Sequence, residues 1–201
     1  MSFWMLGAVR GAILLGNFPT NGDSPTLSTT IGVGSTKAAV FTLGSTNYTI
    51  DNVVLRLENY NTIGGDFATL GFFLDNGSGT NVGAQVGNYL TSPVSASDTA
   101  GFFTFVPGTA VNLTANTKYW LRLSSGSGVF TWDTSNTNIT PTGTGATLNS
   151  MQNSSDNGNN WTGTGNFNSF QINATPVPEP ASVAILAAGG LVVVAQRRRV
   201  A

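Results

Sequence analysis

The stretch YTIDNVVLRLEN, residues 48–59, decides the fold that we predict for this chain. Val53, Leu55 and Leu57 occupy every second position, and the positions between them hold other residues, such as Arg56. Because successive side chains of a strand point to opposite faces, this period of two predicts a half-buried β-strand.

The same pattern recurs between clusters of Gly, Ser, Thr, Asn and Asp that are typical of turns. We interpret as further strands residues 36–43, 66–76, 85–90, 101–107, 116–125, 128–134 and 167–174. Residues 134–166, which are rich in Ser, Asn, Thr and Gly, predict a long loop anchored by Trp161. Short strands with almost no helical periodicity predict an all-β fold, an antiparallel β-sandwich with jelly-roll-like connectivity; an immunoglobulin-like order is the alternative.

The composition supports a folded domain and excludes several kinds of chemistry. Charged residues make up 8 % of the 201 residues, so Gly, Ser, Thr and Asn must supply the polar surface. Twelve Phe, four Trp and four Tyr provide a core and argue against disorder. The chain contains neither Cys nor His, which excludes disulfides, Cys- or His-based metal sites, a thiol nucleophile and a His general base.

The distribution of charge argues against nucleic acid as a partner and against an enzyme. Residues 17–176 carry eight acidic and four basic side chains, and they contain no basic patch that would hold a phosphate backbone. Asp51 and Glu58 lie seven positions apart on one predicted strand, so they point to opposite faces, unlike the paired carboxylates of a glycoside hydrolase. We expect no enzymatic activity, no catalytic residue and no cofactor.

Two Asp-Asn-Gly sequences, at residues 75–77 and 156–158, raise the alternative of a calcium site. Neither continues with the further acidic ligands and closing Glu of an EF-hand loop. Asp-Asn-Gly is also a strong turn signal without any metal. We interpret both sequences as turns and expect no metal site.

Trp120, Trp132 and Trp161 are the candidate ligand-binding residues. Aromatic faces exposed on a β-sandwich would stack on sugar rings, and the Asn and Thr residues around them would supply hydrogen bonds. Trp120 is expected to be the most exposed because it shares a strand face with Arg122. The competing interpretation is core packing, since Trp is highly buried on average. If the platform exists, an extracellular polysaccharide is the expected partner.

The C-terminal segment, residues 176–201, has three ordered parts. Prolines at positions 176, 178 and 180 exclude a continuous helix or continuous sheet pairing. The apolar run 181–195 predicts a single transmembrane helix of about 22 Å, short of the roughly 30 Å hydrocarbon core. The arginines that follow would stay in the cytoplasm. The short run favours transient anchoring, with a permanent anchor and a buried terminal helix as alternatives.

Residues 1–16 are apolar, and we interpret them as a truncated or atypical export signal. Arg10 interrupts the run and no basic residue precedes it, so a buried first strand is the alternative. The predicted organisation is therefore a signal segment at 1–16, a β-sandwich ectodomain at 17–175 and a sorting segment at 176–201.

The tail resembles the PEP-CTERM sorting signal of Gram-negative bacteria. The matching residues are Val177, Pro178, Glu179 and Pro180, the apolar run, and the basic end with Arg197, Arg198 and Arg199. The resemblance implies recognition near Pro-Glu-Pro by exosortase, a membrane transpeptidase. It also implies export across the inner membrane, transient single-pass anchoring and delivery to the cell envelope or extracellular matrix.

The body resembles the choice-of-anchor β-domains, most nearly type R. The sequences that carry this resemblance are YTIDNVVLRL, FLDNG, LTANTKYWLRLS and FTWDTS. That family implies anchoring through interchangeable C-terminal signals and supplies no biochemical activity. The resulting prediction is a non-enzymatic exported surface or extracellular-matrix protein, and the alternative is a carbohydrate-binding β-sandwich module at the cell surface.

Overall fold

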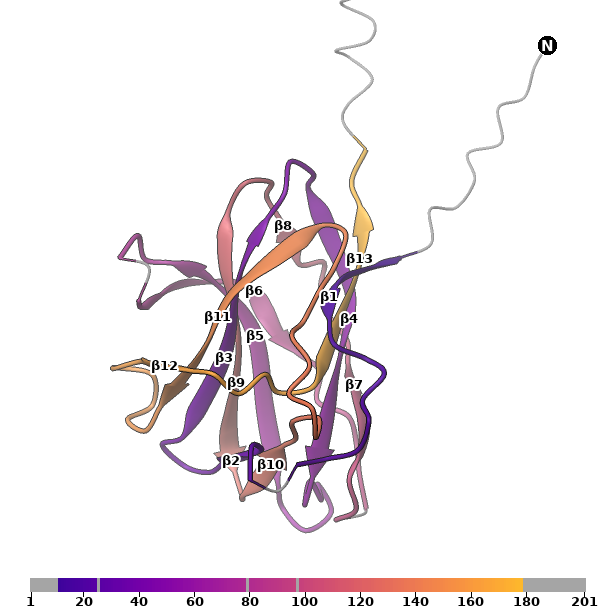
Figure 1. The fold of residues 1–201 in the computed structure, drawn as a ribbon, viewed down its shortest axis with the longest axis vertical. Coiled ribbons are helices and arrows are strands. Elements are labelled where there is room, and N and C mark those ends of the chain that lie inside the picture. Colours follow the sequence, from indigo (N-terminus) through magenta and orange to yellow (C-terminus); the bar gives the residue numbers. More distant parts are fainter. Residues whose placement is uncertain (1–10, 25, 79, 97, 179–201) are drawn as a thin grey trace, which may run out of the picture.

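The computed structural model describes residues 11–24, 26–78, 80–96 and 98–178, and within them the chain forms strands and no helix (Figure 1). One antiparallel sheet of the described residues has seven strands: β1 (Ala12–Gly16), β13 (Phe170–Pro176), β4 (Tyr48–Glu58), β10 (Phe130–Trp132), β2 (Thr29–Ile31), β7 (Gly101–Phe105) and β8 (Asn112–Leu113). The other has six: β12 (Thr162–Thr164), β11 (Ala146–Ser154), β3 (Thr36–Leu43), β9 (Lys118–Ser127), β5 (Phe67–Asp75) and β6 (Val82–Leu90). The all-β prediction is confirmed.

Strand β4 organises the seven-stranded sheet because its eleven residues are long enough to pair with two strands along each edge. One edge pairs with β13 and then with β10, and the opposite edge pairs with β8 and then with β7. The alternation predicted for this stretch is present: Val53, Leu55 and Leu57 are completely buried, whereas Arg56 lies on the outer face in an ion pair.

One hydrophobic core joins the two sheets. Leu55 and Ile172 of the seven-stranded sheet lie in the same buried cluster as Phe41 and Leu121 of the six-stranded sheet. Each fully buried Leu or Phe side chain contributes about 1.5–3 kcal/mol relative to leaving it in water. The facing sides of the two sheets are therefore held together by apolar burial.

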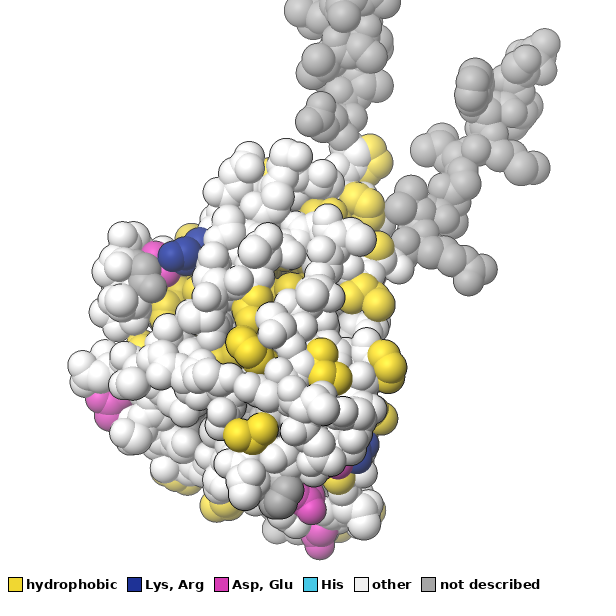
Figure 2. All heavy atoms as spheres, viewed as in Figure 1, with side chains coloured by type: hydrophobic (Ala, Val, Ile, Leu, Met, Phe, Trp, Pro, Cys, Tyr) yellow, Lys and Arg dark blue, Asp and Glu magenta, His cyan; other side chains and the backbone are white. Residues whose placement is uncertain are grey.

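The surface is polar without being highly charged. On the face shown in Figure 2, uncharged side chains and backbone cover most of the area, and charged side chains appear as isolated groups. This agrees with the low content of charged residues.

The two ends of the described chain lie side by side. Strand β1 pairs with β13 so that Ala12 is opposite Ala174, and both ends leave the domain in the same region (Figure 1). Leu14 and Leu15 are buried in the core. The predicted domain boundary after residue 16 is therefore wrong, and the alternative of a buried first strand describes residues 12–16; residues 1–10 lie outside the described residues.

The segment predicted as a long loop contains strands. Strand β11 pairs with β3 over most of its length, and β12 continues the same sheet. Within the described ranges there is no helix long and apolar enough to span a membrane. The transmembrane helix predicted at residues 181–195 lies outside the described residues.

Candidate functional site

Trp132 is a core residue. It is completely buried, its indole Nε1–H donates to the carbonyl oxygen of Ser169 at 3.0 Å, and its ring meets the Phe170 ring edge-on at 6.1 Å between centroids. The indole thus lies between the sheets with its polar atom satisfied. Trp132 has no exposed face on which a sugar could stack.

Trp120 points to the outer face of the six-stranded sheet, the face it shares with Arg122 as predicted, but it is completely buried. Phe73 packs beside it, and Trp161 approaches with 5.2 Å between ring centroids. Its Nε1–H donates to the carboxylate of Asp75 at 3.0 Å. The prediction that Trp120 is exposed is therefore wrong, because the connection that carries Trp161 covers this face.

Trp161 is the partly buried member of the three tryptophans. Its Nε1–H donates to the carbonyl of Gly158 at 2.9 Å, which fixes the ring against its own turn. The structure brings Trp120 and Trp161 together but places Trp132 in the separate core between the sheets. The three residues do not form one platform.

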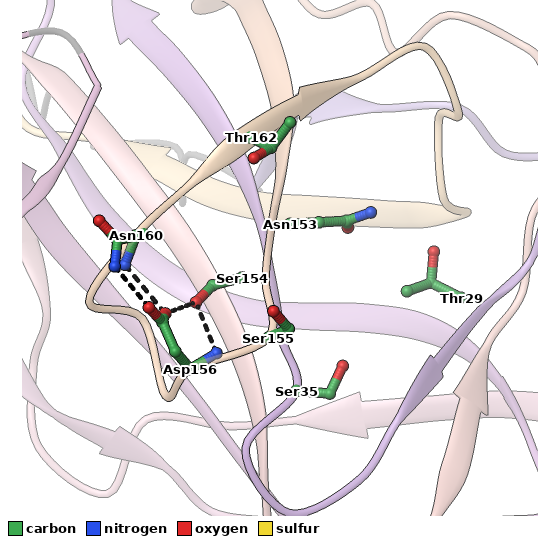
Figure 3. A pocket seen from close by; sticks show the side chains of 8 residues that line it. All are labelled: Thr29, Ser35, Asn153, Ser154, Ser155, Asp156, Asn160 and Thr162. Atoms are coloured by element: carbon green, nitrogen blue, oxygen red, sulfur yellow. Dashed lines mark hydrogen bonds between the residues drawn. The ribbon is translucent and has the colours of Figure 1, made fainter.

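A polar hollow lies where β2 and the start of β3 approach the connection between β11 and β12 (Figure 3). It has a volume of about 300 Å³ and is lined by side chains that carry hydroxyl, amide or carboxylate groups: Thr29, Ser35, Asn153, Ser154, Ser155, Asp156, Asn160 and Thr162. In Figure 3, Asn160 and Asp156 lie on one side of this hollow and Thr29 lies on the other. We call this feature the polar hollow.

A buried lysine lies directly behind one wall of the polar hollow. Lys37 is completely buried, and its Nζ donates to Oγ1 of Thr29 at 3.0 Å. Burial lowers the pKa of Lys37 to about 8 because the ammonium loses its hydration. Within the described part of the chain, no carboxylate lies at ion-pair distance from this Nζ.

Asn153 faces the same space as Lys37. The two residues are directly opposite each other in the β3–β11 pairing, so their side chains share one face of the sheet. The Oδ1 atom of Asn153 is buried without a hydrogen-bond partner. Sequence reasoning missed both residues, although the position of Lys37 two before Ala39 on an apolar strand was a signal that its side chain points inward.

Asp156 has a structural role in the turn at the rim of the polar hollow. Its carboxylate accepts hydrogen bonds from the backbone N–H groups of Asn159 and Asn160, from the Asn160 side chain and from the Ser154 hydroxyl. These hydrogen bonds lower the pKa of Asp156 to about 2, and the one from the backbone N–H of Asn160 has the largest effect. Asn157 and Gly158 adopt positive φ angles, as an Asp-Asn-Gly turn requires.

A second group of charges lies on the outer face of the seven-stranded sheet. Arg56 forms a two-pronged ion pair with Asp23, at 2.8 and 2.6 Å, and its guanidinium lies 4.8 Å from the centre of the Phe102 ring. Nearby Asp133 is 1 % exposed, and its Oδ2 has no hydrogen-bond partner. Burial, together with repulsion from Asp23 and Glu58, raises the pKa of Asp133 to about 7.

These charges do not form a metal centre in the part of the chain that the structure describes. No group of three or more acidic side chains lies close enough there to hold an ion. The buried carboxyl of Asp133 instead has Arg56 as its cationic neighbour, which partly offsets the rise in its pKa.

The predicted sorting residues begin where the β-domain ends. Strand β13 runs to Pro176, which is opposite Tyr48, and the N–H of Val177 then donates to the carbonyl of Asn47 at 2.8 Å. Val177 is 41 % exposed. Glu179, Pro180 and the arginines at 197–199 lie outside the described residues, so Val177 and Pro178 are the members of the predicted motif that the structure places.

The comparison with protein families identifies this tail. Residues 176–199 match the PEP-CTERM protein-sorting motif, and the match begins at the last residue of β13. No curated protein matches the chain. The motif indicates an exported protein of a Gram-negative bacterium that is sorted at the membrane and processed by exosortase.

Proposed function

We propose that this protein is a non-enzymatic β-domain that is exported, held transiently in the inner membrane by its tail, and delivered to the cell surface or extracellular matrix. The observation that carries this proposal is the PEP-CTERM motif at residues 176–199, joined directly to the last strand of a folded domain.

The junction between domain and tail supports transient anchoring. Pairing of β13 with β4 ends at Pro176. One residue later, the backbone N–H of Val177 donates a hydrogen bond to the carbonyl oxygen of Asn47. Pro178 has no N–H to continue the ladder. Cleavage beyond Pro178 would therefore leave every strand pairing among the described residues intact.

We assign the domain to the jelly-roll class of β-sandwich. Four strands of one sheet follow the order β2-β10-β4-β7 and four of the other follow β3-β9-β5-β6, so the chain passes repeatedly between the sheets. Both sheets contribute to a single core, as a sandwich requires. The choice-of-anchor resemblance of the body agrees with a domain whose tail determines its destination.

The non-enzymatic role is supported by the residues available. The chain has no Cys or His. Asp156 is held by its own turn, and Arg56 pairs with Asp23, so these charged groups have structural partners. A surface of hydroxyls and amides suits a protein that is exposed to a hydrated matrix.

Cell fractionation tests the proposal. An epitope tag would be inserted in the exposed turn at Gly64 and the full chain expressed with and without exosortase. We expect the tagged protein in the surface or extracellular fraction when exosortase is present, and in the inner membrane when it is absent. Glu179→Gln is expected to retain the protein in the membrane, whereas Glu58→Gln, a change on an exposed strand position, is expected to have no effect. A soluble cytoplasmic pool of the full-length chain would contradict the proposal.

A further inference from the structure

We propose that Lys37 and Asn153 react with each other to form an isopeptide bond, which ties β3 covalently to β11. The bond would join the Nζ atom of Lys37 to the Cγ atom of Asn153 and release one molecule of ammonia. The chain has no cysteine and therefore no disulfide. A bond between lysine and asparagine would give this domain a covalent cross-link of another kind, and its formation does not depend on the sorting signal.

The two side chains start from positions that face each other. Lys37 and Asn153 are directly opposite in the antiparallel pairing of β3 with β11. Ala39 and Met151, which lie two positions away on the same strands, are buried in the core between the sheets. Because side chains alternate along a strand, Lys37 and Asn153 point to this inner side as well. Cβ atoms of directly opposite residues lie about 4.5–5.5 Å apart, a distance that the flexible stem of lysine can span without movement of either strand.

The hydrogen-bond partners of Lys37 fit an amide better than an ammonium. An ammonium has three N–H donors, and among the described residues the structure gives Lys37 one acceptor, Oγ1 of Thr29 at 3.0 Å. The lysine is completely buried, and no carboxylate of the described residues lies at ion-pair distance from it. Buried charges are ordinarily paired. In an isopeptide bond the nitrogen keeps one N–H and no charge, so the Thr29 hydroxyl alone satisfies it.

The burial that disfavours an ammonium also makes the amine a better nucleophile. Burial lowers the pKa of Lys37 to about 8, so a larger fraction of the amine is uncharged near neutral pH than in an exposed lysine. The Oδ1 atom of Asn153 is inaccessible to solvent and has no hydrogen-bond partner, so water does not compete from this side. Holding the two groups together also replaces a bimolecular step by an intramolecular one, which raises its rate.

The reaction balances without any other reactant. The uncharged Nζ attacks Cγ of Asn153, a bond forms between these two atoms, and the bond between Cγ and Nδ2 breaks. One proton passes from Nζ to Nδ2, which leaves as ammonia. Thr29 accepts the N–H of Lys37 and lines the polar hollow together with Asn153, so its hydroxyl can carry this proton. The Asn153 side chain points toward the side of the hollow where Thr29 lies (Figure 3), and the hollow gives ammonia a way out.

Mass spectrometry of the purified full-length protein tests this inference. The protein would be denatured and digested with trypsin, which cleaves after lysine and arginine but not after an acylated lysine. We expect a branched product in which residues 11–56 are joined to residues 123–197. Its mass should be lower by one ammonia than the sum of the two peptides. The peptide 11–37, which ends at a free Lys37, should be absent.

Variants assign the cross-link to these two residues. Lys37→Met and Asn153→Ala should each abolish the branched product, and digestion of Asn153→Ala should release the peptide 11–37. Two matched controls should keep the branched product: Lys118→Met, at the other lysine of the chain, and Gln152→Ala, at the neighbouring position on the opposite face of β11. A branched product in either Lys37→Met or Asn153→Ala would contradict the assignment. The wild-type digest tests the bond itself, so the inference stays falsifiable if a variant does not fold.

A wild-type digest that contains the peptide 11–37 and no branched product would overturn the inference. Loss of ammonia without the branched product would do the same, because it would indicate a succinimide at an Asn-Gly sequence such as Asn76-Gly77. These measurements use purified protein, so they are independent of sorting. A failure of the fractionation experiment would leave them unaffected, and the reverse is also true.

Discussion

Replacement of Asp133 by Asn should change how the stability of the domain depends on pH. Asp133 is 1 % exposed, and its carboxyl is repelled by the charges of Asp23 and Glu58 and attracted by that of Arg56. Its pKa is raised from 3.8 to about 7, chiefly by burial. The folded protein therefore keeps a proton that the unfolded chain has already released.

The sign and size of the effect follow from this difference. Between about pH 4 and pH 7 the folded state binds more protons than the unfolded state, so the free energy of unfolding falls as the pH rises. At about 1.4 kcal/mol per unit of pKa, the upper limit of the loss is about 4 kcal/mol. The lowered pKa of Asp156 acts only below pH 4, where its contribution to stability is lost, so it lies outside this window.

Urea unfolding followed by tryptophan fluorescence measures this dependence, because Trp120 and Trp132 are buried in the folded state. The full chain in a non-denaturing detergent should lose about 2–4 kcal/mol of unfolding free energy between pH 4.5 and pH 7.5. Asp133→Asn should remove most of that slope, whereas Asp51→Asn, at an exposed position of β4, should keep it. A wild-type profile that is flat or rises over this range would refute the reasoning, as would an unchanged slope in Asp133→Asn.

Three further predictions concern stability. Trp120→Ala should cost about 3–5 kcal/mol of unfolding free energy, as expected for a completely buried aromatic residue, and a urea titration that shows a loss below about 1 kcal/mol would contradict its burial. In the Asn153→Ala variant, whose Lys37 keeps a free amine, Lys37→Met should remove a rise in stability between pH 8 and pH 10.5, where the unfolded chain binds a proton that the folded one has lost; persistence of that rise after the second change would assign it to another group. Gly143→Ala should lower the melting temperature by several degrees, since a Cβ there would overlap the backbone of Leu14; an unchanged melting temperature would mean that β1 is not docked as described.

The regular strands were predictable because their apolar residues obey a period of two. The predicted strands at residues 36–43, 48–59 and 66–76 correspond to β3, β4 and β5, and the inward faces of β4 and β9 are those expected. In these strands local pattern and burial agree. Prediction of the fold class therefore needed no long-range information.

Strand β11 escaped prediction because its pattern is irregular. Ala146, Leu148 and Met151 pack on the core, but the pairing with β3 shifts between Leu148 and Ser150. This bulge changes the spacing of inward residues from two to three, and polar residues occupy the remaining positions. The sequence of the segment consequently resembles a loop, and its pairing with β3 and β12 makes it a strand.

The candidate sites, like β11, could not be predicted from the local sequence pattern alone. The period of two assigned Trp120 to the correct face of its strand, but its exposure depends on a connection some forty residues later in the sequence that carries Trp161. The polar hollow likewise joins β2 to the β11–β12 connection, which are far apart in the chain. Such sites depend on tertiary packing, whereas the tail could be identified because its elements are consecutive.

The central claim is that residues beyond Pro-Glu-Pro are a removable sorting segment attached to a complete β-domain. Mass spectrometry of the cell-surface protein after cleavage before aspartate tests it most directly, since Asp156 is the last aspartate of the chain. The account predicts a C-terminal peptide that begins at Asp156 and ends close to Pro180, without Arg197, Arg198 and Arg199. A surface-exposed protein whose C-terminal peptide extends from Asp156 to Ala201 would contradict it.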